Sequence, residues 1–92
     1  MIRTFADKET ERVFQRLPAK ISKRLEAAAY EKLLYLQVAE SLDDLATPPG
    51  NRLEKLKGDR KGQYSIRVNK QYRICFKWKD GAADEVELVD YH

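Results

Sequence analysis

The sequence closes with Asp90-Tyr91-His92, adjacent side chains that can each accept or donate a proton. His92 is the one histidine in the sequence, and an imidazole titrates near neutral pH, so it can serve as an acid or as a base. A chain end usually frays, but these residues follow a predicted strand directly, and we expect the sheet to hold them. The sequence thus predicts a candidate acid–base site here.

Arg73 and Lys57 are the cations that suit a phosphate group beside such a site, because the planar guanidinium of arginine matches phosphate oxygens. RNA cleavage needs a base for the 2′-hydroxyl proton, a cation for the phosphate charge and an acid for the leaving 5′ oxygen. It needs no metal, and a lone histidine with a lone cysteine cannot form a zinc site. We therefore expect phosphodiester chemistry without metal or cofactor, with an inert chain end as the alternative.

Strict alternation of side chains predicts a hairpin, with strands over residues 64–68 and 72–78 and a turn at Asn69-Lys70-Gln71. The alternate residues on one side of the two strands are apolar and predict a buried face: Tyr64, Ile66, Val68, Tyr72, Ile74, Phe76 and Trp78. The residues on the other side predict a cationic face: Ser65, Arg67, Arg73, Cys75 and Lys77. We expect Cys75 to be tucked among the strands, and Tyr91 to be the aromatic residue that stacks on a base.

Helical patterns come before this hairpin. A short strand is expected at residues 2–5, then a helix capped by Asp7 with Val13, Phe14 and Leu17 on its apolar stripe. Pro18 fits the first position of a second helix that runs to about residue 39, with Val38 on its apolar side. A helical turn near residues 42–45, a short strand at 52–56 and a last strand at 83–89 follow.

This order predicts one α+β domain over residues 1–92. We expect two N-terminal helices on one face of a small, curved, mostly antiparallel sheet, in the order β-α-α-β-β-β or with one further strand. The sequence has neither the apolar segment of a signal peptide nor the roughly 20 apolar residues of a membrane span. With its single cysteine, this favours a cytoplasmic location without membrane contact.

Basic residues concentrate between residues 52 and 79, where ten lysines and arginines face two acidic residues, although the net charge is +3. Such a block predicts a phosphate-bearing partner, and a solvated lysine-rich surface is the alternative. The candidates for contact with an RNA backbone are Lys55, Arg60, Lys61, Arg67 and Lys70.

Three motifs resemble the HigB-type toxins of the RelE/ParE superfamily: PPGNRLEKLKGDR, KGDRKGQYSIRVNKQYRICFKW and the terminal VDYH. The resemblance covers nearly the whole chain. It implies a toxin of a bacterial type II toxin–antitoxin system, an mRNA interferase that arrests growth by cutting mRNA in the decoding site of the ribosome. It also implies that RNA binds the concave side of the sheet, that Asp90, Tyr91 and His92 are functional, that Arg73 stabilises the phosphate and that Lys57 is the loop lysine.

Glu54 stands where some members of this family have a histidine. Either Glu54 takes part of that role, or His92 works with Tyr91, Asp90 and the cations, which we favour from the sequence. The implied partners are ribosome-bound mRNA, ribosomal RNA and a HigA-like helix-turn-helix antitoxin, through which the complex binds operator DNA. Two other classes stay open: a ParE-like gyrase inhibitor without nuclease chemistry, and a non-catalytic RNA-binding module.

Overall fold

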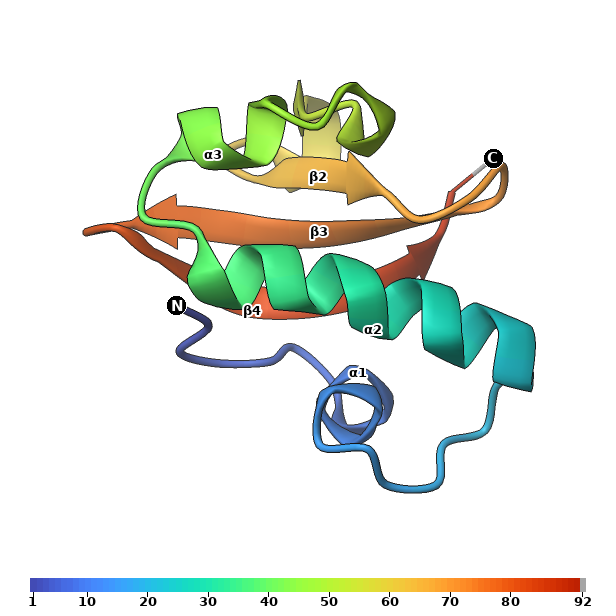
Figure 1. Ribbon diagram of the computed structural model, residues 1–92. Helices are drawn as coiled ribbons and strands as arrows, with labels where there is room; N and C mark the ends of the chain where they lie inside the picture. The colour runs from blue at the N-terminus through green and yellow to red at the C-terminus, as the bar shows by residue number, and fades with distance from the viewer. Residues whose placement is uncertain (92) are drawn as a thin grey trace.

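A four-stranded antiparallel sheet carries the fold, and the computed structural model describes residues 1–91. The elements are α1 (Lys8–Phe14), α2 (Lys23–Val38), α3 (Leu42–Ala46), β1 (Glu54–Lys55), β2 (Tyr64–Arg67), β3 (Tyr72–Lys79) and β4 (Ala82–Asp90), with the 3₁₀ turns η1 (Pro49–Asn51) and η2 (Gly58–Arg60). The strands lie side by side in chain order, β1-β2-β3-β4. The predicted α+β class, with helices before the sheet, is confirmed (Figure 1).

Side-chain caps decide where the first two helices begin. The carboxylate of Asp7 and the hydroxyl of Ser22 accept hydrogen bonds from backbone amides in the first turns of α1 and α2. The prediction that Pro18 opens the second helix is wrong, because Ser22 satisfies those amides and α2 starts after it. Leu17 also lies beyond α1 and is exposed, so it is not part of the apolar stripe.

The apolar core fills the space between α2 and one face of the sheet (Figure 1). Leu33 and Leu36 of α2 meet Ile66, Ile74 and Phe76 of the hairpin, and all of them are fully buried. Each such side chain stabilises the fold by roughly 1.5–3 kcal/mol. The predicted apolar face of the hairpin is confirmed except for Tyr72, which is half-buried and does not pack against the core cluster. Val38, expected on the apolar side of the helix, is exposed.

Two turns fix the register of the long strands. Asp80 and Gly81 join β3 to β4 with φ angles of 54° and 75°, the positive values that a two-residue type I′ hairpin turn requires. At the other end of β3, the side-chain oxygen of Asn69 accepts hydrogen bonds of 2.8 Å from the amides of Gln71 and Tyr72. The predicted turn at residues 69–71 is therefore confirmed, and it is held by its own asparagine.

The N-terminal segment covers the free edge of β4. It forms isolated parallel bridges, from Ile2 to Ala83 and from Phe5 to Val86, in place of the regular first strand that the sequence predicts. Covering this edge leaves fewer free backbone groups for pairing with another chain. Within residues 1–91, no helix combines the length and the apolarity needed to cross a bilayer.

Candidate active site

The sheet face opposite the helices presents two rows of side chains that could do chemistry. One row runs across all four strands: Glu54, Ser65, Cys75 and Glu87. The next row, two residues along, holds Arg67, Arg73 and Val89. The polar residues that alternation predicts for one side of the hairpin therefore lie on one face of the sheet, together with acidic residues from the two outer strands.

Arg73 is buried in this face, with 8% of its surface exposed. Its Nε donates to the hydroxyl of Ser65 at 2.6 Å, and its Nη2 donates to the backbone carbonyls of Ser65 and Arg52. Its Nη1 lies 3.7 Å from Oε1 of Glu54. A buried cation needs such partners to offset its loss of water, so most of the guanidinium serves the protein's own groups.

Glu54 is the exposed half of this ion pair, with 55% of its side chain accessible. It lies on the edge strand β1, two residues after Arg52, which adopts a left-handed conformation with φ 44° and ψ 58°. That conformation costs roughly 1–2 kcal/mol for a residue other than glycine. Backbone strain of this kind gathers at functional sites, and here the bond from Arg73 to the carbonyl of Arg52 holds it in place.

Tyr91 is the residue directly after β4. Val89 stands opposite Arg73 in the β3–β4 ladder, and Tyr91 follows two residues later, so a continuation of the strand alternation predicts that Tyr91 shares the face of Arg73. Its amide donates to the carbonyl of Gln71 at 2.6 Å, which ties the end of β4 to the β2–β3 turn (Figure 1). The expectation that the sheet holds this part of the chain is met for Tyr91, whose side chain is exposed.

The side chain of Asp90 lies on the opposite face of β4 from that of Val89. It stands across from Tyr72, and its carboxylate accepts a hydrogen bond of 3.0 Å from Nε2 of Gln71. The structure therefore places Asp90 at the turn, on the opposite face of the sheet from Arg73. His92, the predicted proton carrier, lies outside the described residues.

Three of the predicted cations gather beside β1. Lys55, Lys57 and Lys61 are exposed and line a shallow hollow of about 360 Å³, together with Leu56 and Gly58. The aliphatic stems of lysines can cover apolar surface while their ammonium groups stay in water. The hollow thus has an apolar wall and a cationic rim, which suits contact with a nucleic-acid strand.

The other predicted cations differ in their partners. Arg60 turns back onto the sheet, where its Nη1 lies 3.2 Å from Oε1 of Glu87 and 3.1 Å from the side-chain oxygen of Gln63. Arg67, half-buried in the row with Arg73, has no hydrogen-bond or ion-pair partner for its side chain within residues 1–91. Lys70 is exposed at the tip of the turn. Arg67 and Lys70 can therefore meet a phosphate more readily than Arg60.

Glu87, an acidic residue of this face, was not predicted from the sequence. Glu87 of β4 stands opposite Cys75. Side-chain alternation along the last strand would have placed Glu87 on this face, but only once the register between β3 and β4 was known. Cys75 itself is fully buried, as predicted. Burial raises the pKa of its thiol and nearby Arg60 lowers it, with a net rise. A buried, protonated thiol is a poor nucleophile. Among residues 1–91, no group of three candidate metal ligands comes together.

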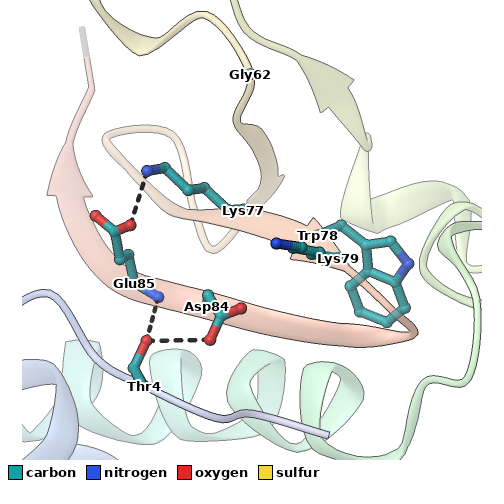
Figure 2. A pocket seen from close by; sticks show the side chains of 7 residues that line it. All are labelled: Thr4, Gly62, Lys77, Trp78, Lys79, Asp84 and Glu85. Carbon is teal, nitrogen blue, oxygen red and sulfur yellow. Dashed lines mark hydrogen bonds and ion pairs between the residues drawn. The ribbon is translucent and has the colours of Figure 1, made fainter.

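A roomier hollow of about 510 Å³ lies toward the Asp80-Gly81 end of the sheet (Figure 2). Its lining residues are Thr4, Gly62, Lys77, Trp78, Lys79, Asp84 and Glu85. Within it, Nζ of Lys77 pairs with Glu85 at 2.7 Å, and the hydroxyl of Thr4 accepts from the amide of Glu85 and contacts the carboxylate of Asp84. Its charges are largely matched internally, and Arg73 lies at the other end of β3, so it is separate from the candidate site.

Comparison with known proteins identifies the family. A family model described as "RelE-like toxin of type II toxin-antitoxin system HigB" matches residues 3–92. The chain is 52% identical over 63 residues to "Toxin HigB-1" of Vibrio cholerae serotype O1, covering 68% of this chain and 66% of that protein. It is 44% identical over 41 residues to "Endoribonuclease HigB" of Proteus vulgaris, covering 45% of each.

A solved structure shares the fold over its whole length. The "YoeB-YefM complex from Staphylococcus aureus" contains a chain that aligns with a TM-score of 0.63 at 22% identity, covering 100% of this chain and 98% of that one. At this identity the likeness concerns the fold alone. Because the family match spans almost the entire sequence, the chain belongs to the HigB-like, RelE-like toxins of type II toxin–antitoxin systems.

Proposed function

We propose that this toxin is an endoribonuclease that cuts mRNA on the ribosome without a metal ion. The observation that carries the proposal is the pair formed by buried Arg73 and exposed Glu54, 3.7 Å apart, on the sheet face opposite the helices. A carboxylate beside a fixed cation suits a phosphodiester, as does a surface whose Arg67 and nearby lysines form no ion pair within residues 1–91. The name of the Proteus relative, an endoribonuclease, supports the same reaction class.

In the proposed reaction, the 2′-oxygen of a ribose attacks the adjacent phosphorus and the bond from phosphorus to the 5′ oxygen breaks. Glu54 takes the 2′-hydroxyl proton, because its carboxylate is exposed and oriented by Arg73. Arg67, whose side chain has no hydrogen-bond or ion-pair partner among residues 1–91, meets the phosphate oxygens, and Lys57 assists from the neighbouring loop. His92 protonates the 5′ oxygen. The products are a 2′,3′-cyclic phosphate and a 5′-hydroxyl.

This assignment differs from the one favoured by the sequence, in which His92, Tyr91 and Asp90 share the proton transfers. The carboxylate of Asp90 accepts a hydrogen bond from Gln71 at the turn, and Asp90 lies on the same face of the sheet as Tyr72. Glu54, in contrast, is held beside Arg73. The structure therefore favours a carboxylate from β1 over the one from β4. Asp90 is better placed to position the chain end than to meet the phosphate.

The proposed partners follow from the same surface and from the family. Ribosome-bound mRNA and ribosomal RNA meet the exposed cations, and a cognate antitoxin neutralises the toxin in the cytoplasm. The structural neighbour is itself a two-protein complex, which supports a protein partner for this fold. Operator DNA is contacted through a helix-turn-helix domain of the antitoxin rather than by this chain.

Induction in bacteria tests the proposal. The intact chain, His92→Gln and a surface control, Glu40→Gln, are expressed separately, and mRNA ends and DNA topology are followed. We expect growth arrest and new mRNA ends within translated codons for the intact chain and the control, and loss of both for His92→Gln. Growth arrest with unbroken mRNA and damaged DNA would instead favour a gyrase inhibitor and overturn the proposal.

A further inference from the structure

A third hollow, of about 380 Å³, lies between the start of α2 and the β2–β3 turn. Its lining residues are Lys20, Ile21, Ser22, Arg24, Leu25, Asn69, Gln71 and Tyr72. The same turn holds the end of β4, because Gln71 accepts from the amide of Tyr91 and donates to the carboxylate of Asp90. This hollow and the candidate active site are thus joined through one residue, Gln71.

The walls of this hollow have three different chemistries. Tyr72 is half-buried and contributes an aromatic wall, while Ile21 and Leu25 contribute apolar surface. Lys20 and Arg24 are exposed, and neither side chain forms an ion pair within residues 1–91. An acidic group does stand at the rim, since Asp90 accepts from Gln71 there.

The turn contributes polar groups to the same hollow. The side-chain oxygen of Asn69 is occupied by the amides of Gln71 and Tyr72, which leaves its NH₂ group to donate outward. An aromatic wall, a cationic rim and an amide donor together match the base, the phosphate and the base edge of a nucleotide. An acidic peptide would use the cations but would gain little from the aromatic wall.

We propose that this hollow is a flanking-nucleotide subsite, which holds a nucleotide of the bound RNA strand next to the scissile phosphate. The proposal rests on the proposed ribonuclease function and adds to it a specific RNA contact outside the reacting atoms. A strand that leaves the face of Arg73 past Tyr91 reaches the hollow by crossing the turn at Gln71. The base packs against Tyr72, and Lys20 and Arg24 bind its phosphate.

Fluorescence anisotropy of the full chain with a 2′-O-methyl RNA hexanucleotide tests the subsite. This probe lacks the attacking hydroxyl, so it binds without being cut. Lys20→Gln/Arg24→Gln is compared with a charge-matched control, Lys8→Gln/Lys23→Gln, whose residues are exposed but do not line the hollow. We expect the pocket variant to bind at least fivefold more weakly than the control.

Tyr72→Leu keeps an apolar side chain but removes the ring, and we expect it to weaken binding by about tenfold, within the range for one stacked base. Thermal melting of each variant verifies that the fold is retained.

Equal affinities for the pocket and control variants would overturn the subsite while leaving ribosomal cleavage by the intact chain untouched. Failure of the intact chain to cut mRNA would overturn the proposed function instead. If the pocket variants bind RNA normally but escape the antitoxin, the hollow is a protein-docking site and the proposal is wrong.

Discussion

In the proposed mechanism, Arg73 and Glu54 have different tasks. Arg73 is fixed by Ser65 and by the carbonyl of Arg52, so it can orient a neighbour but has few donors to spare. Glu54 is exposed beside it and can exchange a proton with substrate. Truncating Arg73 would strand the groups that it satisfies, so a loss of activity would not separate catalysis from folding.

Glu54→Gln gives a cleaner test of the proton-transfer role. The amide keeps the shape of the side chain but cannot take a proton, so we expect single-turnover cleavage of ribosome-bound mRNA to slow by about 10²-fold or more. Glu40→Gln, an exposed carboxylate remote from Arg73 in sequence, serves as the control. Ribosome binding and melting temperature should match the control. An unchanged cleavage rate for Glu54→Gln would remove Glu54 from the mechanism.

Cys75 should be chemically silent in the folded protein. Its thiol is buried and its pKa is raised, chiefly by loss of solvent, so little thiolate forms at pH 8. We expect a thiol reagent to label the native protein far more slowly than the urea-unfolded protein. The stabilisation from the buried neutral thiol is present below its ordinary pKa and is lost as the pH rises above it. Fast labelling of native protein at pH 8 would contradict this account.

Among the elements, the link between α2 and the η1 turn sets the position of β1. Nζ of Lys32 donates to the side-chain oxygen of Asn51 at 2.7 Å, and Nδ2 of Asn51 donates to the carbonyl of Leu45 at 3.1 Å. Asn51 is fully buried and directly precedes Arg52, whose carbonyl binds Arg73. The helix layer therefore positions the β1 edge of the candidate active site through one asparagine.

Asn51→Ala should lower the free energy of unfolding by roughly 1–3 kcal/mol, because it leaves the carbonyl of Leu45 and the ammonium of Lys32 without this partner. Urea denaturation measures the loss, with Gln15→Ala at an exposed helix end as the control. A free energy of unfolding equal to that of the control would show that this network does not hold the η1 turn.

Much of the element pattern could be predicted from the sequence. The alternation of the hairpin, the turn at residues 69–71 and the Asp7 cap all depend on local chemistry, and the structure contains them. The start of α2 could not be chosen between Pro18 and Ser22 from local preference, since both residues favour a helix start. The first segment has strand character, but its partner is the distant β4, which decides that it forms bridges and not a regular strand.

The site was predictable in its residue types but not in its pairings. Parity alone placed Arg73 and Ser65 on one face, yet it could not show that Ser65 would bind the guanidinium or that Arg60 would fold onto Glu87. Those contacts depend on register between strands far apart in sequence. Parity likewise assigned Tyr72 to the core, whereas the start of α2 leaves it lining a hollow.

At the scale of the whole molecule, the cations of one stretch of sequence fall into two groups: some form an ion pair, and others have no ion-pair partner in the described part of the chain. Lys55, Lys57 and Lys61 are exposed around one hollow, whereas Arg60 pairs with Glu87. Affinity for RNA depends on salt in proportion to the number of phosphate contacts, at roughly 0.7–0.9 in the log–log slope for each contact. The two groups should therefore differ in their effect on that slope.

Single lysine-to-glutamine changes at positions 55, 57 and 61 should each lower the salt slope of RNA binding by a value near that of one contact. Arg60→Gln removes the same charge but breaks an internal pair, so its effect on the slope should be smaller. Titrations of labelled RNA at several salt concentrations measure the slope. An Arg60→Gln effect as large as those of the lysines would show that the pair with Glu87 opens when RNA binds.

The most direct test of the central claim is the chemistry of the cut ends. Ribosomes programmed with a defined mRNA are incubated with the intact chain, and the termini of the fragments are identified. Attack by the 2′-hydroxyl, assisted by Glu54 beside Arg73, predicts a 2′,3′-cyclic phosphate or its 3′-phosphate hydrolysis product on one fragment and a 5′-hydroxyl on the other. Uncut mRNA, or fragments with a 3′-hydroxyl and a 5′-phosphate, would contradict the account.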